Sequence, residues 1–287
     1  MSRIAYVSGR YCRHADATVH IEDRGYQFSD GVYEVMAVHG GKLLDEQLHL
    51  NRLDRSLTEL KIVKPVTDRV LRHILRRVVR LNQVANGSVY LQVTRGVAPR
   101  NHAFPVVAYP QLVVTAQRAK PVDPKILAQG ISIISVPDQR WARRDIKSVS
   151  LLANVLGKQA AREAGAYEAW QIDAEGFVTE GTSSNAWIVT ADREIVTRAA
   201  DHRILNGITR LVVLELAAEA GLSFVERPFS LAEAKAAPEA FLTSTTSLIL
   251  PVTRIDGNKI GEGMPGPVTQ RLRERFLAHL ANLAETA

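Results

Sequence analysis

Two prolines interrupt the chain at a point where neither a helix nor a strand continues easily. Pro121 and Pro124 lie in the stretch RAKPVDPKILAQG, and proline removes a backbone donor and fixes φ, so this stretch predicts a connection between elements. The 287 residues are enough for two domains of ordinary size. We therefore predict an N-terminal domain at residues 1–120, a linker at 121–130 and a C-terminal domain at 131–287.

Strand-like and helical patterns alternate on both sides of this break. The stretch GVYEVMAVHGGKLL contains two β-rich runs joined by Gly40-Gly41, which is typical of a hairpin turn. The stretch DEQLHLNRLDRSLTELKI carries leucines at helical spacing, and ISIISVP and ITRLVVLELAAEAG continue the alternation after the break. These patterns predict an α/β (α+β) fold of two domains, with the cleft between them as the default ligand site.

The composition is typical of a packed protein outside the membrane. Apolar residues make up 46% and charged residues 23% of the chain, and no apolar run approaches the ~20 residues that span a bilayer. The N-terminus has no signal-peptide core, so we do not expect export. Cys12 is the single cysteine, which excludes an internal disulfide and a multi-cysteine metal site and fits the reducing cytoplasm.

The net charge of +6 raises the question of an anionic partner. The densest basic patch is RVLRHILRRVVRLNQ, in which Arg72, Arg76 and Arg80 recur every four residues. The opposite helical stripe is apolar and consists of Val70, Leu71, Ile74, Leu75, Val78 and Val79. An amphipathic helix with a solvated basic face explains this pattern, so we do not expect nucleic-acid binding.

Lys147 stands between apolar neighbours, Ile146 and Val149, ahead of an apolar helical pattern. A partly desolvated lysine is a usable amine nucleophile and suits a Schiff base with an aldehyde. A solvated or structural lysine is the alternative, and for a lysine considered alone it is the more common one.

Three further fragments place polar groups where a ligand could use them. In GFVTEGTSSNAWIV, Glu180 interrupts a strand pattern ahead of small hydroxyl residues, although a surface turn also fits. In ILNGITRLVV, Gly207, Ile208 and Thr209 open a helix whose N–H groups could cradle an anion, with an ordinary capped helix as the alternative. The cluster TSTTS at residues 243–247 ends a strand with five hydroxyl residues, which suggests a phosphate or another polar ligand.

Together these fragments supply the groups that a pyridoxal phosphate site requires. The aldehyde takes a lysine amine, the pyridine nitrogen takes a carboxylate, and the phosphate takes arginine with N–H and O–H donors. The stretch LHLNRL adds His49 and Arg52, one helical turn apart.

In its motifs and their order, the sequence resembles the fold-type IV pyridoxal-phosphate enzymes and, among them, the D-amino-acid transaminases. The resemblance covers nearly the whole chain and is carried by EDRGYQFSDGVYEV, HLNRL, QVTRGVAPRNHAFP, RRDIKSVSLLANVLGKQAA, VTEGTSSNAWIV, ILNGITR and FLTSTTSLILPV. The stretch RGVAPRNHAFP favours the D-amino-acid transaminases over their relatives. The resemblance implies a smaller N-terminal α/β domain, a larger C-terminal β-rich domain, and pyridoxal 5'-phosphate in the cleft between them.

The resemblance also implies a role for each matching residue. Lys147 resembles the lysine that forms the Schiff base and then carries the proton between Cα and C4′, and Glu180 resembles the partner of the pyridine nitrogen. The implied phosphate-binding residues are Arg52, Ile208, Thr209, Ser244 and Thr245. The implied residues for the substrate α-carboxylate are Tyr33, Arg100 and His102. Relatives of this kind borrow part of this carboxylate trap from the second subunit, so a homodimer is implied.

The implied reaction moves the amino group of a D-amino acid such as D-alanine to 2-oxoglutarate or pyruvate. Branched-chain L-amino-acid transaminases, (R)-amine transaminases and aminodeoxychorismate lyases share the cofactor groups and stay open as alternatives, although Arg100 with His102 argues against the first two. A basic binding protein without chemistry is the alternative from another class. Ser29 and Trp170 depart from the family pattern, at a glycine and at a smaller aliphatic position, and leave the preferred side chain open.

Overall fold

The computed structural model describes residues 3–120 and 123–286, which form two compact units. The first unit contains the chain up to Lys120, the segment Ile146–Ser150 and the end of the last helix. Of the described residues, the second unit contains residues 123–145 and 151–282. This division differs from the predicted boundaries, because Lys147 belongs to the first unit.

The predicted linker also differs from the structure in its secondary structure. Most of its described part is a short helix, α4 (Pro124–Gln129), which belongs to the second unit. Asp123 caps this helix through its side chain, which accepts a hydrogen bond from the backbone N–H of Lys125 at 2.9 Å. Pro124 is tolerated because the first turn of a helix needs no proline N–H.

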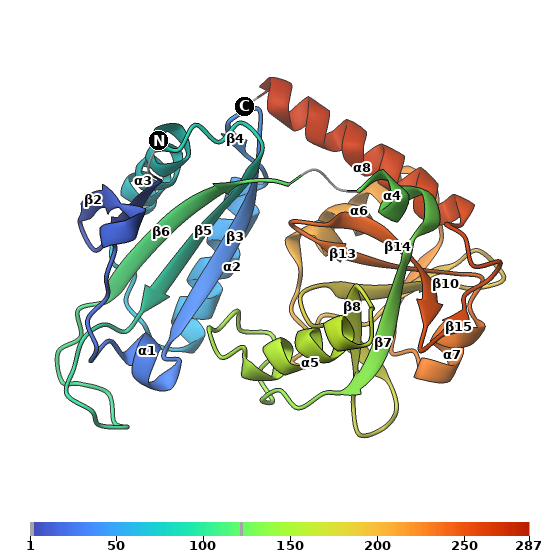
Figure 1. Cartoon of the computed structure of the whole chain (residues 1–287), viewed down its shortest axis with the longest axis horizontal. Coiled ribbons are helices and arrows are strands. Elements are labelled where there is room, and N and C mark those ends of the chain that lie inside the picture. The colour runs from blue at the N-terminus through green and yellow to red at the C-terminus, as the bar shows by residue number, and fades with distance from the viewer. Residues whose placement is uncertain (1–2, 121–122, 287) are drawn as a thin grey trace. The chain divides into compact units, whose positions relative to one another are not determined.

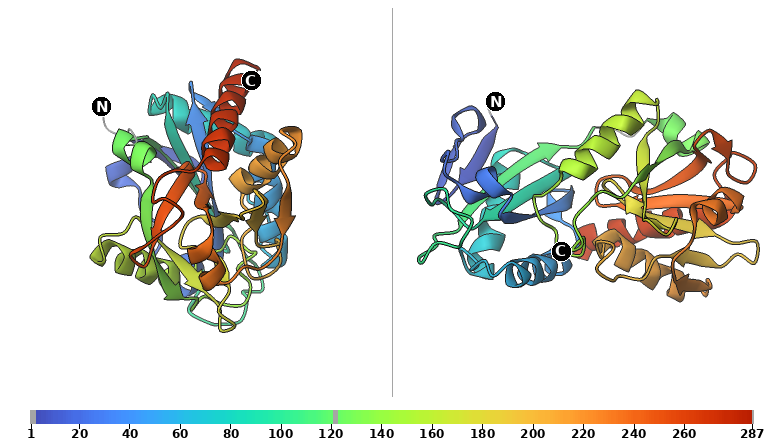
Figure 2. Two further views of the ribbon diagram at one scale, coloured as in Figure 1. Left: turned by 90° about the vertical axis from the view of Figure 1, so that its right-hand side faces the viewer. Right: turned by 90° about the horizontal axis from the view of Figure 1, so that it is seen from below.

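Within residues 3–120, a six-stranded antiparallel sheet has the order β2-β1-β6-β5-β3-β4. Its strands are β1 (Ile4–Val7), β2 (Arg10–Arg13), β3 (Gly31–His39), β4 (Lys42–Leu43), β5 (Gly87–Thr94) and β6 (Gln111–Arg118). The helices of this unit are η1 (His14–Asp16), α1 (Arg24–Phe28), α2 (Glu46–Glu59) and α3 (Asp68–Leu81). Figures 1 and 2 show α2 and α3 on the same face of the sheet, where their apolar stripes bury the core of the first unit.

The predicted hairpin is confirmed at Gly40-Gly41. These two glycines have φ values of +57° and +81°, and they join β3 to β4 with His39 opposite Lys42. A two-residue hairpin turn of this hand needs positive φ at both positions, which glycine adopts without steric cost.

The Arg-rich helix is α3, and its buried face contains most of the predicted apolar stripe. Val70 is the exception, because it is 45% exposed. Its basic face is not simply solvated: Arg72 and Arg76 each donate a hydrogen bond to Glu46 Oε2 on α2, at 2.7 Å. Part of the local positive charge is therefore neutralised within the first unit.

Within residues 123–282, a nine-stranded mixed sheet has the order β12-β11-β10-β13-β14-β7-β8-β9, with β15 paired to β14. Its strands are β7 (Ile131–Pro137), β8 (Glu168–Ile172), β9 (Val178–Gly181), β10 (Asn185–Val189), β11 (Ile195–Thr197), β12 (Phe224–Glu226), β13 (Glu239–Ser244), β14 (Leu248–Ile255) and β15 (Asn258–Lys259). The remaining helices are α5 (Leu152–Glu163), α6 (Ile208–Glu219), α7 (Leu231–Ala236) and α8 (Pro267–Thr286). No helix in the described part of the chain is long and apolar enough to cross a membrane.

Trp170 and Ser29, the two departures from the family pattern, lie in different units. Trp170 is fully buried in the core of the second unit, where its indole packs edge-on against Phe229 with ring centroids 6.2 Å apart. Ser29 has φ +57° at the C-cap of α1, in the left-handed region where glycine costs least. Glycine adopts this conformation without steric cost, which explains why relatives usually have glycine at this position. Serine adopts it with some backbone strain.

The N-terminus of α8 is held by a buried carboxylate. Glu239 accepts hydrogen bonds from the backbone N–H groups of Val268 at 3.0 Å and Thr269 at 2.9 Å, and from the Thr269 hydroxyl at 2.8 Å. A carboxylate at this end of a helix also interacts favourably with the helix dipole.

We expect Glu239→Ala to lower the free energy of unfolding by about 3 kcal/mol, because several donors lose a charged acceptor. Urea titration followed by circular dichroism measures the change. Glu262→Ala, which removes an exposed carboxylate, is the matched control and should stay within about 0.5 kcal/mol of the parent. Equal stability of both variants would contradict this account of the helix terminus.

Candidate active site

Lys147 is held in place through its own backbone. Its carbonyl accepts a hydrogen bond from the Tyr33 N–H at 3.0 Å, and its N–H donates to the Ser56 hydroxyl on α2 at 3.3 Å. Two residues later, the Val149 N–H donates to the Gly31 carbonyl at 3.0 Å. Ile146 is buried in the core of the first unit, which explains the apolar neighbours of the lysine.

The side chain of Lys147 lies over an aromatic ring. Its ammonium nitrogen is 4.3 Å from the centroid of Tyr33, and Tyr33 stacks on Tyr90 with ring centroids 5.7 Å apart. Burial raises the pKa of the Tyr90 phenol to about 12, with a further contribution from Tyr33, so Tyr90 stays neutral at neutral pH. Two of the predicted site residues, Lys147 and Tyr33, are thus in contact.

Arg52 belongs to a buried charged cluster in the same unit. Its Nε and Nη2 both donate to the Glu34 carboxylate at 2.8 Å, and the His49 ring nitrogen Nδ1 lies 2.7 Å from the same carboxylate. Burial alone would raise the pKa of Glu34, but the charge of Arg52 and the hydrogen bonds from Arg52 and His49 lower it to about 2. Burial lowers the pKa of His49, so its ring is neutral at neutral pH.

Sequence reasoning missed Glu34, although the strand contained a signal. In GVYEVMAVH the residues on the buried face are Val32, Glu34, Met36 and Val38, so an acid alternates with apolar residues. A carboxylate on such a face needs a cationic partner. Arg52 lies one turn before Ser56 on α2, so the same helix face carries the partner of Glu34 and the contact to Lys147.

Glu180 is buried on β9, and both of its carboxylate oxygens have partners. Oε2 accepts hydrogen bonds from the Asn185 side-chain amide at 3.0 Å and from the Leu205 N–H at 3.1 Å. Oε1 accepts one from Nη1 of Arg140. Burial raises the pKa of the Glu180 carboxyl, while Arg140 acts in the opposite direction.

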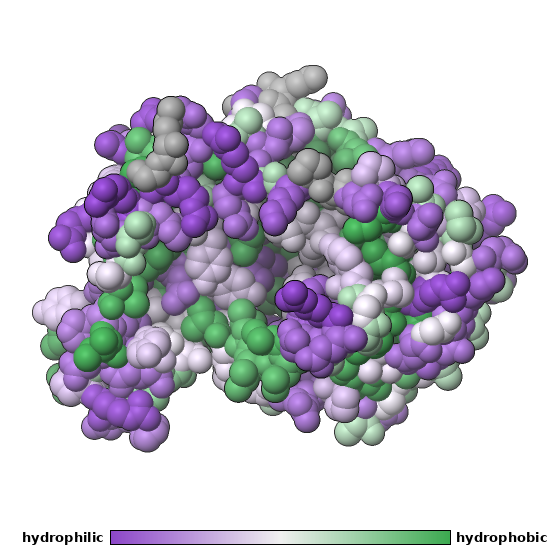
Figure 3. All heavy atoms as spheres, viewed as in Figure 1, coloured by the Kyte–Doolittle hydropathy of each residue, from purple (hydrophilic) through white to green (hydrophobic). Residues whose placement is uncertain are grey.

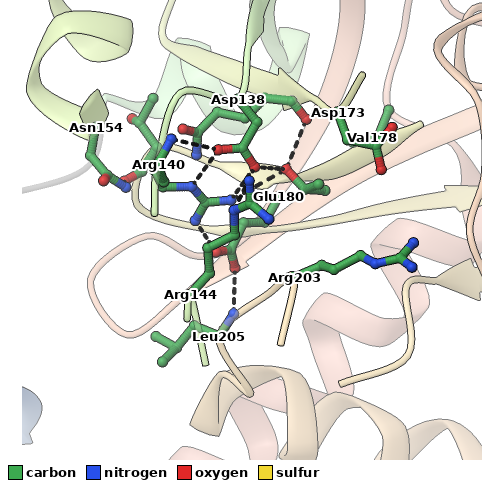
Figure 4. A network of polar contacts seen from close by, with 12 residues as sticks. Asp138, Arg140, Arg144, Asn154, Asp173, Val178, Glu180, Arg203 and Leu205 are labelled. Atoms are coloured by element: carbon green, nitrogen blue, oxygen red, sulfur yellow. Dashed lines mark hydrogen bonds and ion pairs between the residues drawn. The ribbon is translucent and has the colours of Figure 1, made fainter. Parts of the chain in front are cut away.

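Arg140 itself is fixed by a second carboxylate, as Figure 4 shows. Its Nε and Nη2 donate to Asp138 at 2.9 and 2.8 Å, and the Thr179 hydroxyl donates to Asp138 at 2.7 Å. Burial would raise the pKa of Asp138, but Arg140 and Thr179 hold it below its ordinary value. Asp138 therefore orients the guanidinium that contacts Glu180, and the sequence pattern did not reveal either partner.

The hydroxyl run after Glu180 has a structural role. Thr182, Ser183 and Ser184 all donate to the carboxylate of Glu168 on β8, Ser183 at 2.9 Å and Ser184 at 3.4 Å. Glu168 is fully buried and was not identified from the sequence. The turn that follows Glu180 is thus fastened to the neighbouring strand.

The N-terminus of α6 lies against the same polar group. Gly207 is its N-cap and offers no side-chain cap, and Ile208 and Thr209 begin the helix as buried residues. A Cβ on Gly207 would lie 2.1 Å from the Asn185 side-chain oxygen, so glycine is needed for this approach. Asn185 therefore links Glu180 to a helix terminus whose N–H groups suit an anion.

Only part of the TSTTS cluster is available to a ligand. Thr243 is buried, and its hydroxyl accepts a hydrogen bond from the Trp187 indole at 2.9 Å. Ser244, at the end of β13, accepts one from the Ser247 N–H at 3.0 Å, and Thr245 follows in the turn. Because Thr243 pairs with Asn185 across the sheet, these hydroxyls lie in the same part of the second unit as Glu180.

Arg100 and His102 lie on the connection between β5 and β6 in the first unit. Both side chains contact the ring of Phe28: the Arg100 guanidinium carbon is 4.7 Å from its centroid, and the His102 ring centroid is 5.3 Å away. The third predicted trap residue, Tyr33, lies instead against Lys147 and Tyr90.

The first unit also contains a cavity of about 270 Å³. Its lining includes Tyr26, Gln92, Thr94 and Val149, and none of the predicted site residues. Gln92 pairs with Tyr33 across the sheet, so the cavity borders the lysine region without containing its chemistry.

The residues present fit pyridoxal phosphate in kind. The first unit supplies an amine beside an aromatic ring and an arginine, and the second supplies a buried carboxylate and an N-terminal helix turn without a side-chain cap. These are the groups that the aldehyde, the ring nitrogen and the phosphate require. The described residues contain no cluster of His, Cys, Asp and Glu that could hold a metal ion.

Comparison with known proteins decides the family. A profile of the family "Amino-transferase class IV" matches residues 31–255. The chain belongs to this family. It is 44% identical over 281 residues to D-alanine aminotransferase of Bacillus licheniformis, covering 98% of this chain and 97% of the relative. It is 39% identical to that of Staphylococcus haemolyticus, covering 94% of this chain and 95% of the relative.

Solved structures agree on the fold. Branched-chain amino acid aminotransferase of Escherichia coli superposes with a TM-score of 0.89 at 23% identity, covering 97% of this chain and 94% of the other. The 4-amino-4-deoxychorismate lyase of Pseudomonas aeruginosa superposes with a TM-score of 0.82 at 26% identity, covering 96% of this chain and 98% of the other. The predicted fold-type IV class is confirmed, and with family membership so are the aminotransferase activity and the pyridoxal 5'-phosphate cofactor.

The Glu34 cluster predicts a specific pH dependence of stability. The pKa of Glu34 is lowered on folding, so its contribution is complete above its ordinary pKa and is lost as the pH falls from about 5 to 2. We expect Glu34→Gln to be less stable than the parent by about 3 kcal/mol at pH 7, and this difference to shrink over that interval.

Urea titration of both proteins at several pH values measures this difference. Glu274→Gln, which changes an exposed carboxylate, is the control and should show neither effect. A stability difference between Glu34→Gln and the parent that stays constant from pH 7 to about 2.5 would contradict the assignment of this titration to Glu34.

Proposed function

We propose that the protein transfers the amino group of a D-amino acid, D-alanine or one like it, to a 2-keto acid such as 2-oxoglutarate or pyruvate. The observation that carries this proposal is the match to D-alanine aminotransferases at 38–44% identity along almost the whole chain. The branched-chain aminotransferase and lyase structures are 23–26% identical over similar lengths. The alternatives from those groups are therefore not favoured.

Lys147 is the proposed catalytic residue. Its ε-amine would bond to the cofactor aldehyde and, once released, take the proton from the substrate Cα. Pyridoxal phosphate, when bound, supplies the electron sink for this proton transfer. The backbone of Lys147 is hydrogen-bonded to the Tyr33 N–H and to the Ser56 hydroxyl, and this supports the role. Because the backbone is fixed, only rotation of the lysine side chain decides where its amine lies.

Glu180 is the proposed partner of the pyridine nitrogen. Its carboxylate is already oriented by Asn185, Leu205 and Arg140, so little conformational entropy would be lost on binding. The raised pKa of Glu180 makes the carboxylate a stronger proton acceptor and suits a hydrogen bond to a protonated ring nitrogen.

The remaining cofactor-binding residues would hold the phosphate. The proposed donors are Arg52, the N–H groups of Ile208 and Thr209, and the hydroxyls of Thr209, Ser244 and Thr245. The α6 terminus supports this assignment, because its first N–H groups have no side-chain cap and its dipole favours an anion.

Tyr33, Arg100 and His102 would bind the α-carboxylate of the substrate. Charge-assisted hydrogen bonds are worth roughly 1.5–3 kcal/mol each, which is enough to impose one orientation on a small amino acid. With the carboxylate fixed, only one enantiomer can direct its Cα–H toward Lys147. The assignment to the D-enantiomer rests on the curated relatives.

We further propose that the protein acts as a homodimer in the cytoplasm, with Arg100 and His102 serving the site of the other subunit. Figure 3 shows apolar side chains reaching the surface among hydrophilic ones. The loop that carries Arg100 exposes Val106, Val107 and Tyr109, and burying such residues in a subunit contact would be favourable. The single cysteine, Cys12, is in keeping with a reducing compartment.

We expect the pure protein loaded with pyridoxal phosphate to convert D-alanine and 2-oxoglutarate into pyruvate and D-glutamate. L-alanine should react at least about 100-fold more slowly, because one carboxylate orientation serves one enantiomer.

The Lys147→Ala variant should lose about 10³-fold or more in kcat, and borohydride should no longer fix the cofactor to the chain. Lactate dehydrogenase coupling measures pyruvate, and mass spectrometry the fixed cofactor.

The control is Lys125→Ala, which removes an exposed lysine. It should retain parental activity. Pyruvate formed from L-alanine at an equal rate would overturn the D-specific proposal, and a fully active Lys147→Ala variant would overturn the role of the lysine.

Subunit complementation tests the shared site. Lys147→Ala and Arg100→Ala should each be nearly inactive at low D-alanine, whereas a refolded equimolar mixture should recover about a quarter of parental activity, because half of the dimers contain one intact site. Light scattering gives the mass of the species and the coupled assay its activity. A dimeric mixture as inactive as its components would show that Arg100 and Lys147 act within one chain.

A further inference from the structure

We propose that Arg24 and Phe28, both on α1, are positioning residues that hold the loop at residues 100–104 and thereby orient Arg100 and His102 for the substrate carboxylate. This inference rests on the proposed carboxylate trap. It concerns residues of the first unit only, and neither Arg24 nor Phe28 is expected to touch the substrate.

Arg24 binds three consecutive backbone carbonyls of the loop. Its Nη1 donates to the carbonyls of Asn101 at 2.5 Å and Ala103 at 3.3 Å, and its Nη2 donates to that of His102 at 3.2 Å. Arg24 is only 3% exposed, whereas residues 100–104 are all exposed. A buried guanidinium therefore orders a loop that has no helix or strand of its own.

The planar shape of the guanidinium is what this arrangement uses. Its N–H donors point outward in a fixed fork, so one side chain can bind adjacent carbonyls that diverge from one another. The opposite edge of the fork is also occupied, because Nε donates to Asp30 at 2.8 Å. Lysine would keep the charge but could not direct donors at all of these acceptors.

Phe28 provides a surface for the two trap side chains. Its ring centroid is 4.8 Å from the Arg24 guanidinium carbon and 4.7 Å from that of Arg100, and 5.3 Å from the His102 ring. Arg24 thus fixes the loop backbone while Phe28 limits the side chains of Arg100 and His102 to the positions beside its ring.

Asp30, which accepts a hydrogen bond from Arg24, is also bound by Arg95. Asp30 accepts hydrogen bonds from Arg95 Nε at 2.7 Å and Nη2 at 2.9 Å, in addition to Arg24. Arg95 is buried, donates to the carbonyls of Leu60 and Lys61, and lies 3.6 Å from the ring centroid of Phe104 at the end of the loop. The loop is therefore fastened near both of its ends.

The short helix α1 is also fastened to the sheet. Asp23 caps it by accepting from the Gly25 N–H at 2.8 Å, and its other oxygen accepts from the Thr94 hydroxyl on β5 at 2.9 Å. A Cβ at position 25 would lie 2.3 Å from the Thr94 methyl group, so the helix lies directly against the strand. Phe28 is thus carried by an element that has little freedom to shift.

A loop held in advance lowers the entropy that binding must overcome, so its loss should weaken carboxylate binding and leave the chemical step almost intact. We expect Arg24→Lys and Phe28→Leu each to raise KM for D-alanine, and Ki for the inhibitor propionate, by about tenfold. We expect kcat at saturation, the visible absorption of the bound cofactor and its borohydride fixation to Lys147 to change less than about threefold. Arg13→Lys, at an exposed arginine of β2, is the control and should match the parent.

Steady-state kinetics of the holoenzymes, with circular dichroism and thermal melts to establish folding, measure these values. Parental KM and Ki in folded Arg24→Lys and Phe28→Leu would overturn the positioning role, provided that Arg100→Ala raises both constants. If Arg100→Ala leaves both constants unchanged as well, the proposed trap fails, and the inference falls with it. A purely structural role would lower the melting temperature without moving KM or Ki, which also counts against the proposal.

Discussion

The backbone bonds between the segment Ile146–Ser150 and β3 are the interaction on which the proposed chemistry depends. Tyr33 donates to the Lys147 carbonyl and Val149 donates to the Gly31 carbonyl, so a segment more than a hundred residues later in the chain extends the hydrogen bonding of the first sheet. Main-chain bonds of this kind place a side chain more firmly than packing alone, because they fix both neighbouring peptide groups. A lysine on a free loop would have to lose that freedom on every encounter with the cofactor.

Buried carboxylates with dedicated partners form the second level of organisation. Glu34 is paired with Arg52, Glu180 with Arg140, and Glu168 with a set of hydroxyls. Each would be costly to bury alone, so each fixes the position of the segment that supplies its partner. The consequences for the pKa differ. Arg52 lowers the pKa of Glu34 to about 2, whereas burial outweighs the attraction of Arg140 and raises that of Glu180. The first carboxylate is thus a permanent structural anion, and the second is suited to share a proton with a ligand.

Local patterns in the sequence were reliable where local physics decides the outcome. The Gly40-Gly41 hairpin and the buried face of α3 follow from backbone freedom and from helical periodicity, and motif order was enough for the family. The partners of the carboxylates could not be read in this way. Arg140 lies 40 residues before Glu180, and Glu34 lies 18 before Arg52, so their pairing depends on strand order and register that no local pattern contains. The same limit explains why Lys147, adjacent to α5 in sequence, belongs to the first unit.

The loop at residues 100–104 shows how exposed and buried residues divide the work of recognition. Its side chains are the part that the sequence motif points to, because Arg100 and His102 would supply the charge and the hydrogen-bonding groups for a carboxylate. On the proposed account their positions depend on Arg24, whose buried guanidinium donates to the loop carbonyls and not to a side chain of the loop. Every residue has a backbone carbonyl, so the side chains of the loop can change while these hydrogen bonds keep the loop backbone in the same position. Substrate preference can therefore change through the exposed residues without disturbing the scaffold that orients them.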